Sequence, residues 1–307
     1  MEIVRGYRNV PASWPGAAVA IGNFDGVHLG HRALLDSARA HAARVPGAKA
    51  VVLTFDPHPS VVFAQNPPAP MLSSLERKLE LLAAAGMDAV VVEPFTRELA
   101  NASPDAFVDD VVIAALHARA IVIGYDFNYG KSRAGTIETL RDHGVRANIA
   151  VDVVPAIEIE GEVASSTKIR NHLRAGELAR AERLLGRRWD VDGVVVHGAG
   201  RGRAIGVPTA NISPDSDLPV APGIYAVTLC VDGAHLPAVA SLGTNPTFVD
   251  GGSLVLEVHV LDWSGDLYDR HVRTTFVARL RDEAKFTSVD ALVEQIREDI
   301  RLARTKL

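Results

Sequence analysis

Residues 17–31 read AAVAIGNFDGVHLGH, and this stretch decides the fold of the first half of the chain. It starts with an apolar run that ends in isoleucine, which is typical of a buried β-strand. Residues 31–45 have apolar positions three and four apart, which predicts a helix. Between them, Gly22, Gly26 and Gly30 let the backbone approach a ligand closely, because glycine has no side chain. This arrangement predicts a phosphate site, since a helix N-terminus offers unpaired N–H groups.

The alternation of β-like runs and amphipathic helical stretches continues through the first half of the chain. The expected strands are 17–21, 50–54, 89–92, 120–123 and 151–154, and the expected helices are 31–45, 74–85, 104–115 and 136–143, followed by two short helices within 165–185. Such alternation predicts a doubly wound, mainly parallel, Rossmann-like sheet. Ligands of these sheets bind beyond the carboxyl ends of the strands. The glycine-bearing loops after residues 21 and 123 both lie at that edge.

The pattern changes after Gly186. From there, β-like runs are separated by Gly, Pro, Asn or Asp, which predicts a small antiparallel β-barrel. The runs are 191–196, 224–231, 238–242, 254–261 and 272–280. An amphipathic stretch at 289–302 predicts a terminal helix. We therefore expect two domains, residues 1–186 and residues 187–307.

His28 and His31 are separated by about one helical turn, so their rings can point to the same side. In that position they could stabilise the negative charge that grows on an α-phosphate during attack. These residues alone leave two other interpretations open, a tight turn with two surface histidines or a pair of metal ligands. Because the pair follows a strand and a glycine turn directly, nucleotide binding is favoured.

The string GNFDGVHLGH at residues 22–31 resembles the His-x-Gly-His nucleotidylyltransferases. It is more closely similar to the adenylyltransferase module of bacterial bifunctional riboflavin kinase/FAD synthetases. Three later segments resemble the same family: TFDPHP at 54–59, GYDFNYG at 124–130 and SSTKIR at 165–170. The resemblance implies an enzyme that binds ATP and transfers its adenylyl group to FMN.

The resemblance also implies roles for individual residues. His28 and His31 would be catalytic. ATP and its phosphates would contact Gly22, Asn23, Phe24, Asp25, Gly30, Ser165, Ser166, Thr167, Lys168 and Arg170, and the flavin would contact Phe55, Pro57, Asp126 and Asn128. Lys168 stands where the family commonly has arginine, and lysine lacks the bidentate fork of a guanidinium group. We therefore expect Arg170 to make the main triphosphate contact.

A second constellation, GVVVHGAGRGRAIGVPTAN, occupies residues 193–211. Its glycine-rich part can wrap phosphates through free backbone amides. The candidate phosphate contacts are Gly198, Gly200, Gly202 and Arg203. Thr209 and Asn211 add hard oxygen donors that suit Mg²⁺ shared with ATP phosphates. From the residues alone, a hairpin loop with a proline turn stays open as an alternative. The string resembles the glycine arch and PTAN motif of the riboflavin kinase family.

The segment LEVHVLD at residues 256–262 resembles the strand that carries the catalytic glutamate of that family. By this match Glu257 would be the general base that accepts the proton of the riboflavin 5′-hydroxyl. Glu257 and His259 alternate with apolar residues and so share one face of the strand. The alternative is that this face is simply exposed to solvent.

Composition narrows the remaining classes. The 307 residues carry a net charge of −5, which argues against nucleic acid or an anionic membrane as a partner. A single cysteine, Cys230, allows no disulfide within the chain, and the N-terminus has no apolar signal-peptide core. We therefore expect a cytoplasmic protein, and the resemblance implies ATP, riboflavin and FMN as its partners and Mg²⁺ as its cofactor. A homo-oligomer is compatible with the sequence. The competing hypotheses are a nucleotidylyltransferase with another acceptor, a flavin-binding regulator and a flavin-dependent oxidoreductase.

Overall fold

The computed structural model describes residues 1–63, 68–198, 200, 202, 205–244 and 254–307. They form two compact units. The first unit comprises Met1–Ala69 and Leu75–Ala164, and the second comprises Pro70–Ser74 and Ser165–Leu307. By their contacts, helices α7 (Ser166–Arg174) and α8 (Leu178–Leu185) therefore belong to the second unit. The boundary at residue 186 rests on the change of sequence pattern and stays a prediction.

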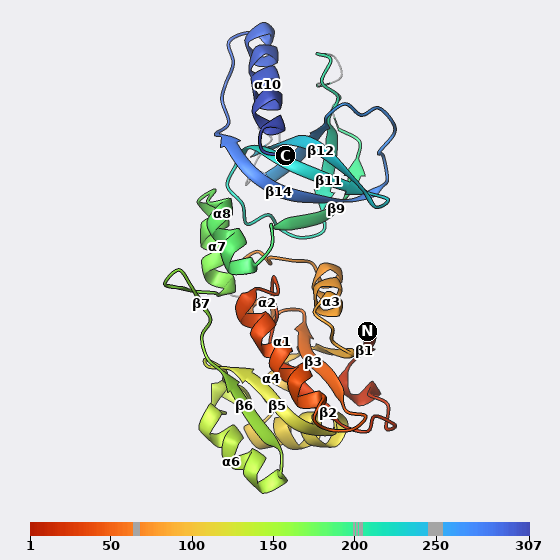
Figure 1. The fold of residues 1–307 in the computed structure, drawn as a ribbon, viewed down its shortest axis with the longest axis vertical. Helices are drawn as coiled ribbons and strands as arrows, with labels where there is room; N and C mark the ends of the chain where they lie inside the picture. Colours follow the sequence, from red (N-terminus) through yellow and green to blue (C-terminus); the bar gives the residue numbers. More distant parts are fainter. Residues whose placement is uncertain (64–67, 199, 201, 203–204, 245–253) are drawn as a thin grey trace. The chain divides into compact units, whose positions relative to one another are not determined.

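A six-stranded sheet forms the centre of the first unit (Figure 1). Its strands are β1 (Glu2–Arg5), β2 (Ala17–Ile21), β3 (Lys49–Asp56), β4 (Ala89–Pro94), β5 (Ala118–Gly124) and β6 (Ala150–Val154). They lie in the order β1-β4-β3-β2-β5-β6, and every pairing is parallel. The predicted parallel sheet is confirmed. The sequence prediction did not include β1.

Both faces of this sheet are buried. Successive side chains of a strand point to opposite sides, so one strand contributes to an apolar cluster on each face. Along β2, Val19 and Ile21 join one apolar cluster, while Ala18 and Ala20 join the other. Helices α1 (Leu29–Ala42) and α3 (Leu75–Ala84) contribute to the cluster that contains Ala18. The π-helix η2 (Phe107–Ala115) and helix α6 (Ile137–Ala147) contribute to the other. The unit is therefore doubly wound, as the alternating pattern predicts.

Several boundaries differ from the predicted ranges. The first helix begins at Leu29 because His28, not a residue after it, caps its N-terminus. The predicted helix 104–115 is a short α5 (Pro104–Ala106) that continues into η2. The smaller elements of the unit are η1 (Tyr7–Asn9), α2 (Pro59–Val62), α4 (Arg97–Ala100), η3 (Lys131–Arg133), β7 (Glu158–Ile159) and β8 (Glu162–Val163).

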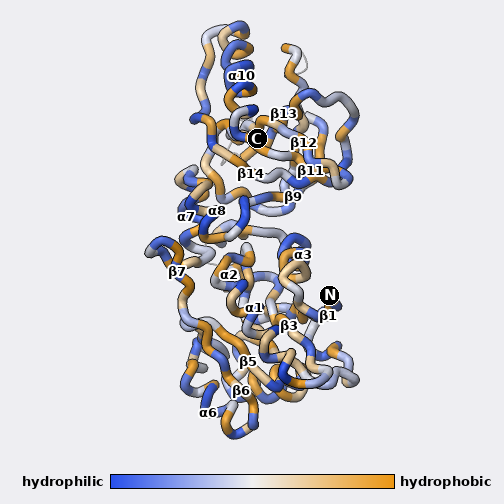
Figure 2. The backbone as a smooth tube through the Cα atoms, viewed as in Figure 1, coloured by the Kyte–Doolittle hydropathy of each residue, from blue (hydrophilic) through white to orange (hydrophobic). Residues whose placement is uncertain are grey.

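The second unit contains a closed antiparallel barrel, which confirms the predicted fold class. Its strands are β9 (Asp190–Val196), β10 (Ala210–Pro214), β11 (Gly223–Val231), β12 (Ala234–Thr244), β13 (Leu254–Val260) and β14 (His271–Arg281), in the order β10-β13-β12-β11-β14-β9. Figure 2 shows the mixture of hydrophobic and hydrophilic residues along the terminal helix α10 (Val289–Arg304). Across the described residues, no helix combines the length and the apolar character that a membrane span needs.

Two stretches of the chain meet in the second unit. The indole Nε1 of the buried Trp189 donates a hydrogen bond of 2.9 Å to the carbonyl oxygen of Leu72. The Nε of Arg170 donates one of 2.8 Å to the carbonyl oxygen of Pro70. These bonds hold Pro70–Ser74 against residues that follow it by about a hundred positions or more, which explains why this short segment groups with the second unit.

A buried ion pair holds α10 to the barrel. Arg281 on β14 donates from Nε and Nη2 to the two carboxylate oxygens of Asp299, at 2.8 and 2.7 Å. Asp299 is 2% exposed, and Gln295 also donates to it, at 3.0 Å. Removing one partner of a buried pair is strongly destabilising, because the other charge is left without compensation.

We predict that Asp299→Asn destabilises the second unit by about 3 kcal/mol, from the typical cost of breaking a buried pair. The measurement is urea denaturation followed by circular dichroism. Glu298→Gln is the matched control, since Glu298 pairs with Arg301 on the exposed side of the same helix and should leave the midpoint unchanged. Equal midpoints for the two variants would contradict an anchoring role for Asp299.

Candidate active sites

The glycine turn after β2 places two histidine rings against each other at the start of α1. His28 is the N-cap, and its Nδ1 accepts a hydrogen bond of 3.3 Å from the backbone N–H of His31. This bond puts the proton of a neutral His28 ring on Nε2. The two rings are stacked with centroids 3.6 Å apart. The pair therefore lies at the positive end of the helix, where an anion is favoured.

The packing around Gly30 leaves little room for a side chain. A β-carbon built on Gly30 would lie 3.1 Å from two atoms of the His28 ring and 3.2 Å from the carbonyl oxygen of Ala164. The preceding turn is unusual as well, since Phe24 and Val27 have φ angles of 51° and 42°. A β-branched residue rarely adopts such a backbone, and strain of this kind is typical of functional sites. The His-x-Gly-His spacing thus has a steric reason.

The His31 ring is neutral. Burial, reinforced by His28 and then by Lys78, lowers its pKa well below the ordinary value of 6.5. Its Nδ1 is buried and has no hydrogen-bond partner. A neutral imidazole can donate one N–H to an oxygen of a phosphate. His31 is therefore able to act as a hydrogen-bond donor, without a full positive charge.

Lys78 on α3 is a candidate site residue that the sequence prediction missed. It is 6% exposed, although lysine is rarely buried. Burial lowers its pKa, and the negative charges of Asp25 and Asp56 oppose that shift. Its position three residues after Leu75 and four before Leu82 puts it on the apolar face of the helix, and this was the available signal in the sequence.

The expected flavin contacts lie beside the histidine loop along one edge of the sheet. Phe55 is at the end of β3 and Pro57 follows it, while Asp126 and Asn128 follow β5. Strand β2 pairs with both β3 and β5, so the loops after these three strands leave neighbouring strand ends. Asp126 and Asn128 are exposed, and Asn128 donates to the backbone oxygen of Asp126 at 2.9 Å.

Two further aromatic residues join Phe55, and the sequence prediction did not include them. The Phe95 ring packs edge-on against Phe55 with centroids 5.5 Å apart, and against Phe63 with centroids 5.9 Å apart. Phe63 is 60% exposed. An exposed aromatic ring supported by others can stack on a flat ligand.

The SSTKIR segment begins α7 in the second unit. Ser165 is the N-cap, and its Oγ accepts from the backbone N–H of Lys168 at 3.3 Å. Ser166, Thr167 and Lys168 form the first turn. Arg170 is 8% exposed and donates to Pro70, as described above. The histidines lie in the first unit, so a single ATP site formed by both groups stays a prediction.

The second constellation converges on Glu257. Asn211 on β10 lies opposite Glu257 on β13, and Ser241 on β12 lies opposite Glu257 from the other side. The hydroxyl of Thr209 donates to Oε2 of Glu257 at 3.3 Å. A hydroxyl, a carboxamide and a carboxylate therefore gather on one face of the barrel. Glu257 is half-buried, so this face is not simply open to solvent.

Glycines of the arch approach the same side chains closely. A β-carbon on Gly198 would lie 2.1 Å from Nδ2 of Asn211, and one on Gly202 would lie 2.3 Å from the carbonyl oxygen of Val207 and 3.2 Å from the Thr209 hydroxyl. Gly200 has a φ of 68° with open space around it. Arg203 lies outside the described residues.

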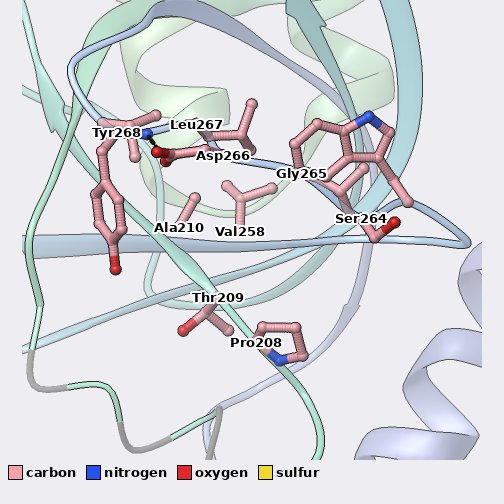
Figure 3. Close-up of a pocket in the computed structure, with 12 residues that line it drawn as sticks. Pro208, Thr209, Ala210, Val258, Ser264, Gly265, Asp266, Leu267 and Tyr268 are labelled. Carbon is pink, nitrogen blue, oxygen red and sulfur yellow. Dashed lines mark hydrogen bonds between the residues drawn. The ribbon is translucent and has the colours of Figure 1, made fainter.

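A pocket of about 410 Å³ lies beside Thr209. Figure 3 shows Pro208 and Thr209 at one rim and the 264–268 loop at the other, with Ala210 and Val258 between them. The Tyr268 ring of this loop stacks on His197 with centroids 3.9 Å apart. The sequence prediction did not include residues 264–268 of the pocket, because it identified the strands and not the loop between β13 and β14.

Comparison with known proteins decides the family. Residues 10–168 match the family described as FAD synthetase, and residues 185–307 match the family described as riboflavin kinase. A Pseudomonas fluorescens protein named bifunctional riboflavin kinase/FMN adenylyltransferase is 37% identical over 99% of this chain and 97% of its own length. The chain belongs to the bifunctional riboflavin kinase/FMN adenylyltransferase family. An Escherichia coli member with the same name is 37% identical over 99% of this chain and 97% of its own.

The fold agrees with a solved structure at full length. A crystal structure from Streptococcus pneumoniae, titled as a macrolide-efflux protein, has a TM-score of 0.88 and 31% identity and covers 99% of both chains. Membership of the bifunctional family means that the chain is an enzyme with two ATP-dependent activities. It phosphorylates riboflavin to FMN and transfers an adenylyl group to FMN to give FAD.

The neutral His31 ring predicts how the stability of the first unit depends on pH. The unfolded chain takes up a proton at His31 near pH 6.5, whereas the folded chain does so only at much lower pH. The free energy of unfolding should therefore fall as the pH drops below about 6.5, by at most about 1.4 kcal/mol per pH unit.

The measurement is urea denaturation between pH 7.5 and 5.5. His31→Gln should lose less stability than the wild type over this range. His235→Gln, which changes an exposed histidine of the barrel, should keep the wild-type dependence. Identical pH profiles for His31→Gln and the wild type would show that this ring is not held neutral in the folded state.

Proposed function

We propose that His28 and His31 stabilise the α-phosphate of ATP while the phosphate of FMN attacks it and pyrophosphate leaves. The stacked rings support this assignment, because they lie at the N-terminus of α1, where the helix dipole favours an anion. The neutral state of His31 suits a hydrogen-bond donor. No side-chain nucleophile takes part, so catalysis consists of positioning and charge stabilisation.

The remaining contacts of this reaction follow the expected set. ATP would lie along the glycine turn, on the backbone and side chains of Gly22, Asn23, Phe24, Asp25 and Gly30. Ser165, Ser166, Thr167 and Lys168 would bind the β- and γ-phosphates at the N-terminus of α7, whose unpaired N–H groups favour anions. Because Arg170 already donates from Nε to Pro70, it would reach a phosphate only through its terminal nitrogens.

The flavin of FMN would lie beyond the ends of β3 and β5, against Phe55, Pro57, Asp126 and Asn128. We add Phe63 and Phe95 to this set, because their rings continue the aromatic surface that starts at Phe55. Lys78 would balance the charges of Asp25 and Asp56 beneath the histidine loop.

For the kinase, we propose Glu257 as the general base that takes the proton of the riboflavin 5′-hydroxyl as it attacks the γ-phosphate of ATP. The hydrogen bond from Thr209 to the Glu257 carboxylate is the observation that carries this proposal. It orients the carboxylate. Gly198, Gly200, Gly202 and Arg203 would surround the phosphates, and the pocket beside Thr209 has a volume suited to the rest of the nucleotide.

The side chains around Glu257 fit Mg²⁺, which would neutralise charge on the ATP phosphates. Mg²⁺ prefers oxygen ligands and usually takes one or two from protein, with the rest from phosphates and water. Thr209 and Asn211 supply such oxygens on the face that Glu257 occupies. A cytoplasmic location and a homo-oligomeric state stay predictions.

His31→Ala is expected to lower the rate of FAD formation from FMN about 10²- to 10³-fold, as for loss of one charge-stabilising donor. The affinity for ATP should change much less, because the contribution belongs to the transition state. His28→Asn should behave similarly, and it keeps an N-cap acceptor for α1. Steady-state kinetics with ATP and FMN measure both effects.

His41→Ala, near the other end of α1, is the matched control and should keep the wild-type rate. Riboflavin phosphorylation should survive all three changes. A folded protein with both His28→Asn and His31→Ala that forms FAD at nearly the wild-type rate would return the two histidines to a structural role.

Glu257→Gln keeps the shape of the side chain and removes its basicity. FMN formation from riboflavin should fall about 10²- to 10⁴-fold, the usual effect of losing a general base. FAD formation from supplied FMN should stay nearly unchanged, and chromatography of the products separates the two activities. An equal loss of both activities would point to misfolding instead of a lost base.

A further inference from the structure

His259 holds the segment that carries Thr209. Its Nδ1 lies 2.8 Å from the carbonyl oxygen of Pro208. A carbonyl only accepts hydrogen bonds, so the proton is on Nδ1 of the ring. The bond joins β13, where Glu257 lies two residues earlier, to the residue immediately before Thr209.

Pro208 and Thr209 lie beyond the end of the backbone pairing between β10 and β13, so the His259 bond links Pro208 to β13. The β10–β13 pairing runs from Ile212 opposite Leu256 to Ala210 opposite Val258. Extended by one position, the register would place Thr209 opposite His259, but the ladder ends at Ala210. Pro208 has no N–H and cannot donate to a ladder. The His259 side chain thus supplies a cross-strand bond where the backbone supplies none.

Thr209 is sensitive to this bond. Its hydroxyl reaches Oε2 of Glu257 at 3.3 Å, which is long for a hydrogen bond between two oxygens. A small displacement of the Pro208–Thr209 peptide would therefore break the contact. On the other side of the segment, Val207 is tied by its N–H to the carbonyl oxygen of Gly202. That bond fixes Val207 relative to Gly202, whereas the Pro208 carbonyl is oriented by its bond to His259.

We propose that His259 is a positioning residue of the kinase, which fixes the Pro208 carbonyl so that Thr209 points at Glu257 and at the phosphates of ATP. The proposal rests on the kinase roles of Thr209 and Glu257 given above. His259 acts through Thr209 and does not touch the reacting atoms.

The test compares three substitutions of His259. The amide nitrogen of asparagine lies near the place of Nδ1, whereas that of glutamine lies near the place of Nε2. His259→Asn should therefore keep most of the kinase activity. His259→Ala and His259→Gln should lower kcat about 10-fold and raise KM for ATP several-fold, the size expected for one lost hydrogen bond at a site. KM for riboflavin and FAD formation from FMN should stay unchanged.

The exposed His235 on β12 gives the matched control, and His235→Ala should leave all constants at the wild-type values. A purely structural role for His259 would lower the melting temperature and the active fraction with KM for ATP unchanged. That outcome would overturn the proposal, as would a His259→Asn variant no better than His259→Gln.

A double-mutant cycle with Thr209→Ala separates this proposal from the one on which it rests. If His259 acts through Thr209, adding His259→Ala to Thr209→Ala should cause little further loss. Fully additive losses would overturn the positioning role alone. Wild-type kinase activity in Thr209→Ala would instead remove the proposed role of Thr209 itself.

Discussion

The first unit depends on the parallel pairing of β2 with β3 on one side and with β5 on the other. Parallel strands carry their loops at a common edge, and the sheet order makes these three loops neighbours. The histidine pair, the aromatic residues around Phe55 and the Asp126–Asn128 loop are therefore adjacent by topology. Adenylyl transfer needs two substrates side by side, and the contacts proposed for ATP and for the flavin include residues of these adjacent loops.

Both candidate sites use the missing side chain of glycine in the same way. At Gly30 the free space is taken by the His28 ring, and at Gly198 it is taken by the carboxamide of Asn211. In each case a polar side chain lies close to a backbone position where a β-carbon would crowd it. The glycines at positions 30 and 198 thus leave room for a neighbouring polar side chain, which is a role distinct from backbone flexibility.

The sequence predicted elements well where one physical rule dominated. Apolar runs such as residues 17–21 became strands, and the change of pattern after Gly186 correctly predicted a barrel of another architecture. Predictions failed where tertiary packing decided. Helix α1 starts early because a histidine ring acts as its cap, and Phe55 and Phe95 meet because β3 pairs with β4. Lys78 was missed because a lysine on a helix is normally read as exposed. The Thr209–Glu257 bond depends on a strand register that periodicity alone does not reveal.

The short segment Pro70–Ser74 limits where the chain can be divided without loss of contacts. The second unit is assembled from two stretches of chain that are separated by most of the first, and the buried indole of Trp189 finds its acceptor in the earlier one. A gene cut anywhere between the two activities would leave that donor without its partner. A fragment that keeps every contact of the second unit therefore has to include Pro70–Ser74 as well as Ser165–Leu307.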